Sequence, residues 1–285
     1  MAVGVLLEAR LREPLFVRDV CSALASINPS GLLVADRNRL VFSAQSSMQS
    51  ATLWAELAID SMLEHISHLT DFAIEIHFES FHRMFRSFNS MGEVFIRVTP
   101  RSTTRRVVGL RINNESDGPE MIVRQRINAL EIPLSAVPTE PIISSLDMCC
   151  ELALGQLPQI VRVAEKYRQL DHTLDIKLSS DHVFSVIIQP AGVQINTSWT
   201  VIFPEVLPGT QESQSTPRSA LPMFGTASIT SISVQARDWY NAIAHCQQLA
   251  RRVVVGIVGN EVLAVFCYPH TENEENVLTF YLSSA

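Results

Sequence analysis

The stretch VVVGIVGNEVLAVF, from Val253 to Phe266, decides between two kinds of fold. Glycines that directly follow an apolar strand can form a phosphate-binding loop, in which the amides of a following helix N-terminus hold the anion. Here Gly259 and Asn260 are followed by the β-rich run EVLAVFCY, and no Lys-Ser or Lys-Thr pair follows the glycines. The sequence therefore predicts a β-hairpin turn and not a nucleotide-binding loop.

Outward from this hairpin, the chain repeats one order of elements twice. Each half reads as a strand, a helix, three strands, a further strand, a second helix and at least three strands. The four helices are expected in PLFVRDVCSALASI (14–27), ESFHRMFRSFNSM (79–91), QLPQIVRVAEKYRQL (156–170) and RDWYNAIAHCQQLA (237–250). This order predicts an α+β chain of antiparallel sheets, with both helices of each half on one face.

A proline-containing segment separates the halves. PLSAVPTEPIISS (133–145) contains three prolines and no periodic pattern, so it is predicted to be an extended connector. The expected domains are residues 1–132 and 146–285, each of an ordinary domain size. A second irregular run, 207–225, is polar and rich in Pro and Ser, and is predicted to be a mobile loop.

Charge and composition exclude several classes of protein. The net charge is −7, so the chain is not a basic nucleic-acid binder on average, and any DNA contact would use local basic faces. Of the 22 basic residues only Lys166 and Lys177 are lysines, so arginine would make nearly all phosphate contacts. We expect no signal peptide and no membrane span, because the start lacks a basic leader and no run of about 18 apolar residues occurs. The five cysteines form no CxxC pair and are expected to be reduced and buried.

The sequence gives only weak evidence for catalytic or metal-binding sites. His65 and His68 could share a helical face, but no third ligand lies nearby, so a solvated loop is the better interpretation. The pairs 171–172 and 181–182, each Asp-His, resemble turn residues that flank a strand. No Gly-x-Ser-x-Gly motif occurs. The sequence predicts no enzyme activity, no cofactor and no metal.

The helices give a clearer indication of function, because several have basic residues opposite an apolar stripe. The fourth helix has no Arg or Lys over Asn241–Ala250, before Arg251 and Arg252 at its end. Basic helix faces on an acidic chain favour a surface that follows phosphates without reading bases. The basic residues concerned on the first three helices are Arg18, Arg83, Arg86, Arg162 and Lys166.

The duplicated order, the connector and five local stretches resemble the sliding-clamp (PCNA-like) fold. The chain is more specifically similar to the Hus family of subunits of the heterotrimeric DNA-damage checkpoint clamp. The resemblance covers the whole chain and rests on LLEARL at the start, ATLWAEL with Trp54, LPQIVRVAEKY after LDMCCELA, the connector, and the ending NVLTFYLSSA.

The resemblance implies a non-catalytic subunit of a ring of three different clamp subunits, the other two of the Rad type. It further implies that helices line a channel around double-stranded DNA, bound without sequence preference, and that edge strands pair across subunits. Its implied partners are a checkpoint clamp loader and repair enzymes. It implies a nuclear protein, with a cytoplasmic pool of unassembled subunit, that supports checkpoint signalling. By position, Arg18, Arg83, Arg86, Arg162 and Lys166 match sites where clamps carry channel-facing basic residues.

Two alternatives remain open at this point. One is a homotrimeric, PCNA-like replication clamp, against which the uneven basic faces of the four helices argue. The other is an α+β enzyme with an unrecognised site in a cleft.

Overall fold

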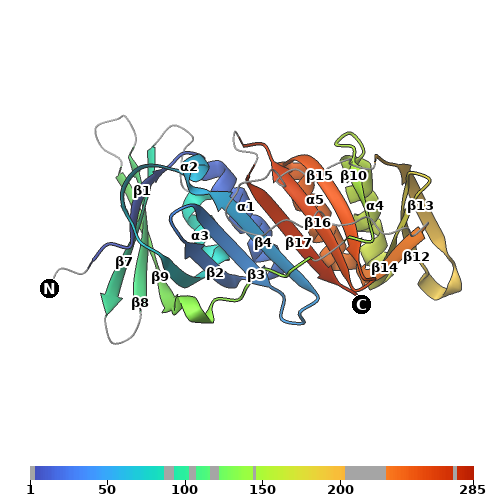
Figure 1. Ribbon diagram of the computed structural model, residues 1–285, viewed down its shortest axis with the longest axis horizontal. Coiled ribbons are helices and arrows are strands. Elements are labelled where there is room, and N and C mark those ends of the chain that lie inside the picture. Colours follow the sequence, from blue (N-terminus) through green and yellow to red (C-terminus); the bar gives the residue numbers. More distant parts are fainter. Residues whose placement is uncertain are drawn as a thin grey trace. The chain divides into compact units, whose positions relative to one another are not determined.

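The structure is a computed structural model that describes residues 4–86, 93–102, 107–115, 122–143, 146–202, 229–271 and 275–285. The expected loop at 207–225 lies outside these residues. The chain divides into two compact units, coloured mainly blue to green and green to red in Figure 1. The first consists of Met1–Ala44 and Trp54–Thr139, and the second of Gln45–Leu53 and Glu140–Ala285.

In the part of the first unit that the structure describes there are the two expected helices, a short helix and nine strands. The helices are α1 (Pro14–Ile27), α2 (Ile59–Met62) and α3 (Phe78–Arg86). The strands are β1 (Leu7–Leu11), β2 (Ser30–Ala35), β3 (Arg39–Gln45), β4 (Ala51–Ala58), β5 (Leu63–Leu69), β6 (Phe72–His77), β7 (Glu93–Ser102), β8 (Val107–Glu115) and β9 (Ile122–Ile132).

The strands of the first unit follow the order β4-β3-β2-β6-β9-β8-β7-β1-β5, and every described pairing is antiparallel. Helices α1 and α3 lie next to each other behind β2 and β3 (Figure 1). Pro14 starts α1, where its missing N–H costs no hydrogen bond. The apolar stripe of α3 is fully buried, and Phe81 packs edge-on against Phe85 with ring centroids 5.2 Å apart.

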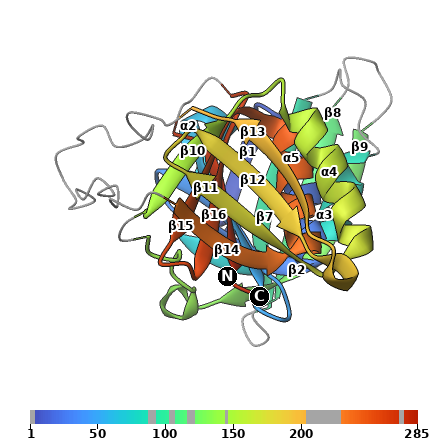
Figure 2. The same ribbon diagram turned by 90° about the vertical axis from the view of Figure 1, so that its right-hand side faces the viewer.

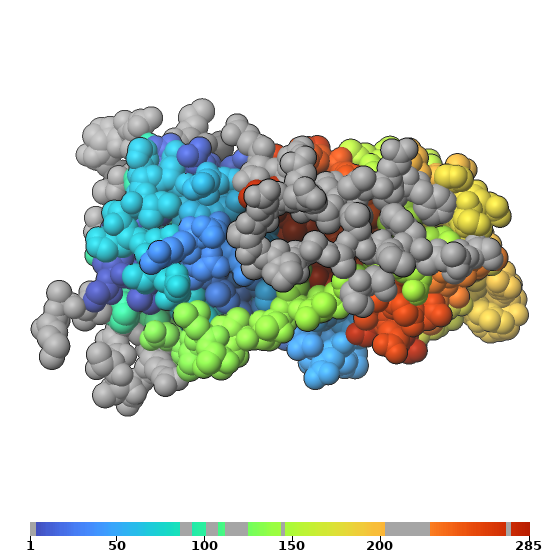
Figure 3. Space-filling view, viewed as in Figure 1, coloured from blue at the N-terminus to red at the C-terminus, as the bar shows by residue number. Residues whose placement is uncertain are grey.

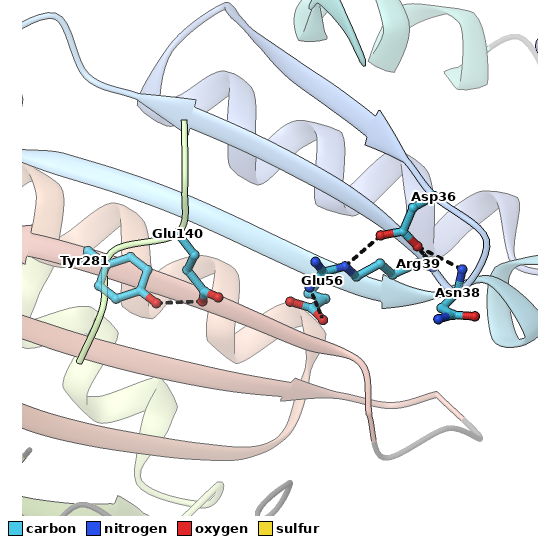
Figure 4. Close-up of polar contacts among 6 residues, drawn as sticks. All are labelled: Asp36, Asn38, Arg39, Glu56, Glu140 and Tyr281. Carbon is cyan, nitrogen blue, oxygen red and sulfur yellow. Dashed lines mark hydrogen bonds and ion pairs between the residues drawn. The ribbon is translucent and has the colours of Figure 1, made fainter. Parts of the chain in front are cut away.

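Polar residues fix the turn between β2 and β3 (Figure 4). The Asp36 carboxylate accepts the backbone N–H groups of Asn38 (2.8 Å) and Arg39 (2.9 Å), and the Arg39 side chain reaches both Asp36 and Glu56 at 3.0 Å. Partial burial alone would raise the pKa of Asp36, but these hydrogen bonds outweigh burial and lower it. The turn is therefore held by charge-assisted bonds around one arginine.

Over its described residues, the second unit contains two α-helices and eight strands. The helices are α4 (Leu157–Leu170) and α5 (Ala236–Leu249). The strands are β10 (Met148–Leu152), β11 (Thr173–Ser179), β12 (Val183–Ile188), β13 (Ile195–Thr200), β14 (Ile229–Gln235), β15 (Ala250–Val258), β16 (Val262–Pro269) and β17 (Val277–Ser283). They form the runs β10-β15-β16-β17 and β13-β12-β11-β14.

Helices α4 and α5 lie side by side against the strands of the second unit (Figure 2). Their core is aromatic, because Trp239 of α5 is fully buried and lies 5.9 Å from Phe184, whose ring is 5.8 Å from Trp199. The tip of the β3–β4 hairpin belongs to this unit, where Ser50 donates a hydrogen bond to Asp238 of α5 at 2.7 Å. The predicted order, strand-helix-strands twice over, is confirmed.

The hairpin predicted in Val253–Phe266 is confirmed as β15 and β16, paired from Val258↔Val262 outward. Gly259 and Asn260 both have positive φ, 58° and 55°, and Glu261 N–H donates to Val258 C=O at 3.0 Å. These are the features of a type I′ turn, whose twist matches that of the strands it joins.

Gly256 has a different role from the turn glycine. It lies within β15 opposite Ala264, and a Cβ placed there would come within 2.7 Å of Leu146 Cδ2. Leu146 packs in a buried cluster with Cys149, Val254 and Tyr268. The glycine therefore lets Leu146 lie directly on the strand.

Replacing Gly259 with alanine should lower the free energy of unfolding by about 1–2 kcal/mol, because the left-handed conformation strains any residue with a Cβ. No atom lies within 4 Å of the added Cβ, so the loss measures backbone strain alone. Urea unfolding of the full chain measures it. The matched control is Gly155→Ala, which is equally open but does not have a positive φ and should leave stability unchanged or slightly raised. Equal effects of the two substitutions would contradict the turn assignment.

Two local predictions differ from the structure. His65 and His68 were expected in a solvated loop, but Leu63–Leu69 forms strand β5 along β1. The connector was expected to be extended throughout, but Leu134–Ala136 forms a 3₁₀ turn. The described part of the connector is largely exposed, with Ile142 90% accessible, and it crosses the surface in Figure 3. Within the second unit Tyr281 donates a hydrogen bond to Glu140 at 2.7 Å, which fixes the end of the connector (Figure 4).

Candidate nucleic-acid interface

Helix α4 presents the strongest basic surface among the predicted residues. Its buried stripe is Leu157, Ile160, Ala164 and Tyr167. Arg162 and Lys166 are four residues apart and exposed on the opposite side of the helix, so their side chains lie one turn apart. Neither makes an ion pair with any residue that the structure describes. Two like charges one turn apart repel each other, so neither side chain neutralises the other. Both are therefore available to contact a polyanion.

The predicted basic residues on α1 and α3 are less available. Arg18 pairs with the neighbouring Asp19 carboxylate at 2.7 Å. Arg83 pairs with Glu79 one turn earlier on α3, and this hydrogen bond lowers the pKa of the Glu79 carboxyl. Arg86 is the last residue of α3, and its side chain lies outside the described part of the chain. A phosphate would have to compete with a carboxylate at Arg18 and Arg83.

The prediction from sequence did not include a basic residue on the fourth helix, but the structure has one, Arg237. Helix α5 begins at Ala236, so its first turn contains the exposed Arg237, whereas Arg251 and Arg252 lie on β15. Arg237 lies on the side of α5 opposite the buried Trp239, which a helical wheel started at Ala236 would have shown.

One further arginine joins the two helices of the second unit. The Arg168 guanidinium lies 3.9 Å from the ring centroid of Tyr240, a cation–π contact. It places the last turn of α4 beside the first turns of α5. The basic side chains of α4 and Arg237 are therefore carried by two neighbouring helices.

Nothing in the described residues supports catalysis or metal binding. His65 and His68 are exposed on β5, not in a loop as expected, and no group of three metal-ligating side chains occurs among those residues. The Asp171 carboxylate accepts the backbone N–H of His172 at 2.7 Å, and His182 has positive φ, so both Asp-His pairs are turn residues as predicted. None of the described helices is long and apolar enough to span a bilayer.

The cysteines are not activated nucleophiles. All five are free and buried, as predicted. Burial raises the pKa of the Cys149 thiol to about 11 and raises the pKa of Cys21 and Cys150 further. Burial also raises the pKa of Cys246, aided by its hydrogen bond with Cys267. A reactive cysteine needs a lowered pKa and access to solvent. Cys21, Cys149, Cys150 and Cys246 have neither, and Cys267 is buried.

The native chain should therefore react very slowly with iodoacetamide at pH 8, where the thiolate form of Cys149 is only about 0.1% of the total. All five thiols should react at once after unfolding in urea. Mass spectrometry of the intact chain counts the labels. A rapid single label on the folded chain would contradict the burial of these thiols.

Comparison with known proteins identifies the family. The profile of the family described as Hus1-like protein matches residues 7–285. The chain belongs to the Hus1-like family. Among solved structures, the Hus1-like chain resembles the crystal structure of proliferating cellular nuclear antigen from Entamoeba histolytica, with a TM-score of 0.71 at 11% identity. The match covers 99% of this chain and 100% of that one. No curated protein matches the sequence.

These findings confirm the sliding-clamp fold and the resemblance from which it was expected. The Hus1-like chain is a subunit of the DNA-damage checkpoint clamp, a PCNA-like ring, and it is not an enzyme. The α+β enzyme alternative is thereby set aside. A Hus1-like chain works in a clamp complex together with other subunits.

Proposed function

We propose that this Hus1-like chain supplies one third of a ring whose other two members are clamp subunits of the Rad type. Two open strand edges, one in each unit, support the ring, and membership of the Hus1-like family, whose members work with other clamp subunits, supports the unlike neighbours. A ring closes when one edge of each subunit pairs with a different edge of the next.

The first open edge is β13. It pairs with β12 on one side, and no strand among the described residues pairs with its other side. Its sequence INTSWT contains no charge and no proline, the residues with which edge strands normally prevent pairing. The opposite edge of the same sheet, β14, is occupied at one point, where Ala285 N–H donates to Ser233 C=O at 2.9 Å.

The second open edge is β9. It pairs with β8 along its whole length, but with β6 only at Leu130–Ile132. Residues 122–129 therefore present a long edge that lacks a second partner among the described strands. The β9 and β13 edges differ in length and charge, since β9 includes Arg124, Arg126 and Glu131. Two different open edges allow the head-to-tail pairing that closes a ring.

The helices would line the channel of this ring and contact duplex DNA through its phosphates. The proposed contacts are Arg18, Arg83, Arg86, Arg162 and Lys166. Arg162 and Lys166 have the best support, because they are exposed and unpaired among the described residues. Sparse cations on an acidic chain suit a ring that slides on DNA, because few phosphate contacts give weak, sequence-independent binding.

The wider role follows from this assembly. We propose that a checkpoint clamp loader places the ring on DNA, that the loaded ring recruits repair enzymes, and that the chain acts in the nucleus. We also propose that the clamp domains are residues 1–132 and 146–285, joined by the connector 133–145.

Light scattering of the purified chain alone tests the heterotrimer. In a ring of three different subunits each edge of this chain is complementary to an edge of another protein and not to its own second edge, so we expect a monomer over a wide concentration range. A stable homotrimer would contradict the proposal and would favour a homotrimeric, PCNA-like clamp.

A further inference from the structure

Three arginines lie directly opposite one another on neighbouring strands of the first unit. Arg97 of β7 pairs with Arg111 of β8, and Arg111 pairs with Arg126 of β9. We call these three residues the arginine row. Residues in register on adjacent antiparallel strands have Cα atoms about 4.5–5.5 Å apart, so the three guanidinium groups share one small area.

The arginine row lies on the face of the sheet turned away from the core. Ile96 and Val98, which flank Arg97 along β7, are buried, as is Leu110 beside Arg111. Side chains alternate between faces along a strand, so the arginines project from the opposite face. The row therefore does not face α1 and α3, the helices proposed to approach DNA.

A pocket of about 240 Å³ lies at the arginine row. Its lining residues are the three arginines with Thr99 and Gly109. Thr99 is paired with Gly109 across β7 and β8, one position along from the arginines on the same face. Gly109 has no side chain, so β8 contributes only backbone to the pocket lining next to Arg111.

The charge in this pocket is only partly compensated. The Arg97 guanidinium lies 3.5 Å from Glu8, which is beside it on β1. The Arg97 Nε atom is buried and has no hydrogen-bond partner in the described structure. Arg111 and Arg126 make no ion pair with any described residue. Three positive charges thus face one carboxylate.

The neighbouring arginine on β1, Arg10, shows that this excess of positive charge is confined to the arginine row. Arg10 of β1 pairs with Glu64 at 2.6 Å and also with Glu93. The charge of Arg10 is therefore neutralised by carboxylates, whereas most of the positive charge of the arginine row is not. Like charges directly opposite one another destabilise a sheet, and local violations of this kind are expected at functional sites.

We propose that the arginine row binds the phosphate group of a phosphorylated serine or threonine in a partner protein. A doubly charged phosphate has several acceptor oxygens, and arginine forks bind such a group through paired hydrogen bonds. The pocket accommodates one such group, bounded by Glu8 on one side. A nucleic-acid strand needs a basic track along successive phosphates, which a single pocket beside carboxylates does not provide.

The test uses the full-length chain and a bead-bound degenerate library of phosphoserine and phosphothreonine peptides, with its unphosphorylated counterpart and a short DNA duplex. We expect retention on the phosphorylated library only, and competition by pyrophosphate. Arg111→Gln removes the central member of the row and should reduce retention at least about tenfold. Arg37→Gln, which removes an exposed arginine of the β2–β3 turn, should leave it unchanged.

The stability of the variant separates binding from a structural role. In phosphate-free buffer Arg111→Gln should be at least as resistant to urea as the wild-type chain, because it relieves repulsion. A clear loss of stability would overturn the proposal. Three further outcomes would also overturn the proposal. The chain could be retained equally on both libraries, or Arg111→Gln could weaken only its binding to the DNA duplex. Inorganic phosphate could also stabilise the chain against urea while no peptide binds. Because the chain is tested alone, none of these outcomes depends on ring assembly.

Discussion

A ring that contains the R162Q/K166Q variant of this chain should bind duplex DNA roughly tenfold more weakly at moderate salt. Both side chains are exposed on one side of α4 and have no ion-pair partner among the described residues. Each phosphate contact contributes about 0.9 to the slope of log affinity against log salt concentration, so the slope should become shallower by about 1.8. Fluorescence anisotropy with a labelled duplex, repeated over a salt series, measures both quantities.

The control for this variant is Lys177→Gln, which removes one positive charge from strand β11, half the charge change of the double variant, and should leave the slope unchanged. Arg18→Gln should change it less than either α4 residue, because Asp19 already pairs with that arginine. An unchanged slope for R162Q/K166Q would remove α4 from the DNA-facing surface. An equal effect of Lys177→Gln would show that only net charge matters.

Lysines at Asn196 and Ser198 should prevent this chain from entering the ring. Both residues are exposed on β13, so within the folded chain the change removes only the hydrogen bonds of the Ser198 hydroxyl to Ser185 and Asn196. In the proposed ring their charges would be placed at a strand-pairing interface without partners, at a cost of about 3 kcal/mol, which is more than a hundredfold in affinity. Analytical size-exclusion chromatography of the variant with its partner subunits measures the loss.

The control for the edge variant is Ser231→Lys, on β14 at the opposite edge of the same sheet, which the proposed ring does not use. It introduces the same side chain at an exposed position and should assemble normally. Circular dichroism should show that both variants fold. Normal assembly of N196K/S198K would mean that β13 is not a subunit interface.

Local chemistry explains which parts of the fold were predictable. The turn at Gly259 and Asn260 could be predicted because those residues tolerate positive φ and separate two apolar runs. Helix α4 could be predicted because its apolar residues recur at helical spacing. Strand β5 was missed because its EHISHL sequence is mostly polar and exposed, so it lacks the apolar alternation that marks a half-buried strand.

The remaining features of the candidate site depend on information that lies outside any short stretch. The Glu79–Arg83 ion pair could have been anticipated, because the two residues have the i,i+4 spacing of a helical pair. Arg83 would then have been expected to contact DNA less readily than an unpaired arginine. The arginine row could not, because Arg97, Arg111 and Arg126 meet only through the register of three strands. A shift of one residue in either pairing would turn a member of the row to the other face.

The central claim is that this chain belongs to a ring that encircles DNA, and topology tests it most directly. The assembled clamp would be loaded onto nicked circular DNA, washed with high salt, and compared before and after the circle is cut. A ring linked to the circle resists salt, since salt weakens phosphate contacts but cannot open a closed link. We predict salt-resistant retention on the circle and complete loss after linearisation. Equal retention on circular and linear DNA, or none on either, would contradict the account.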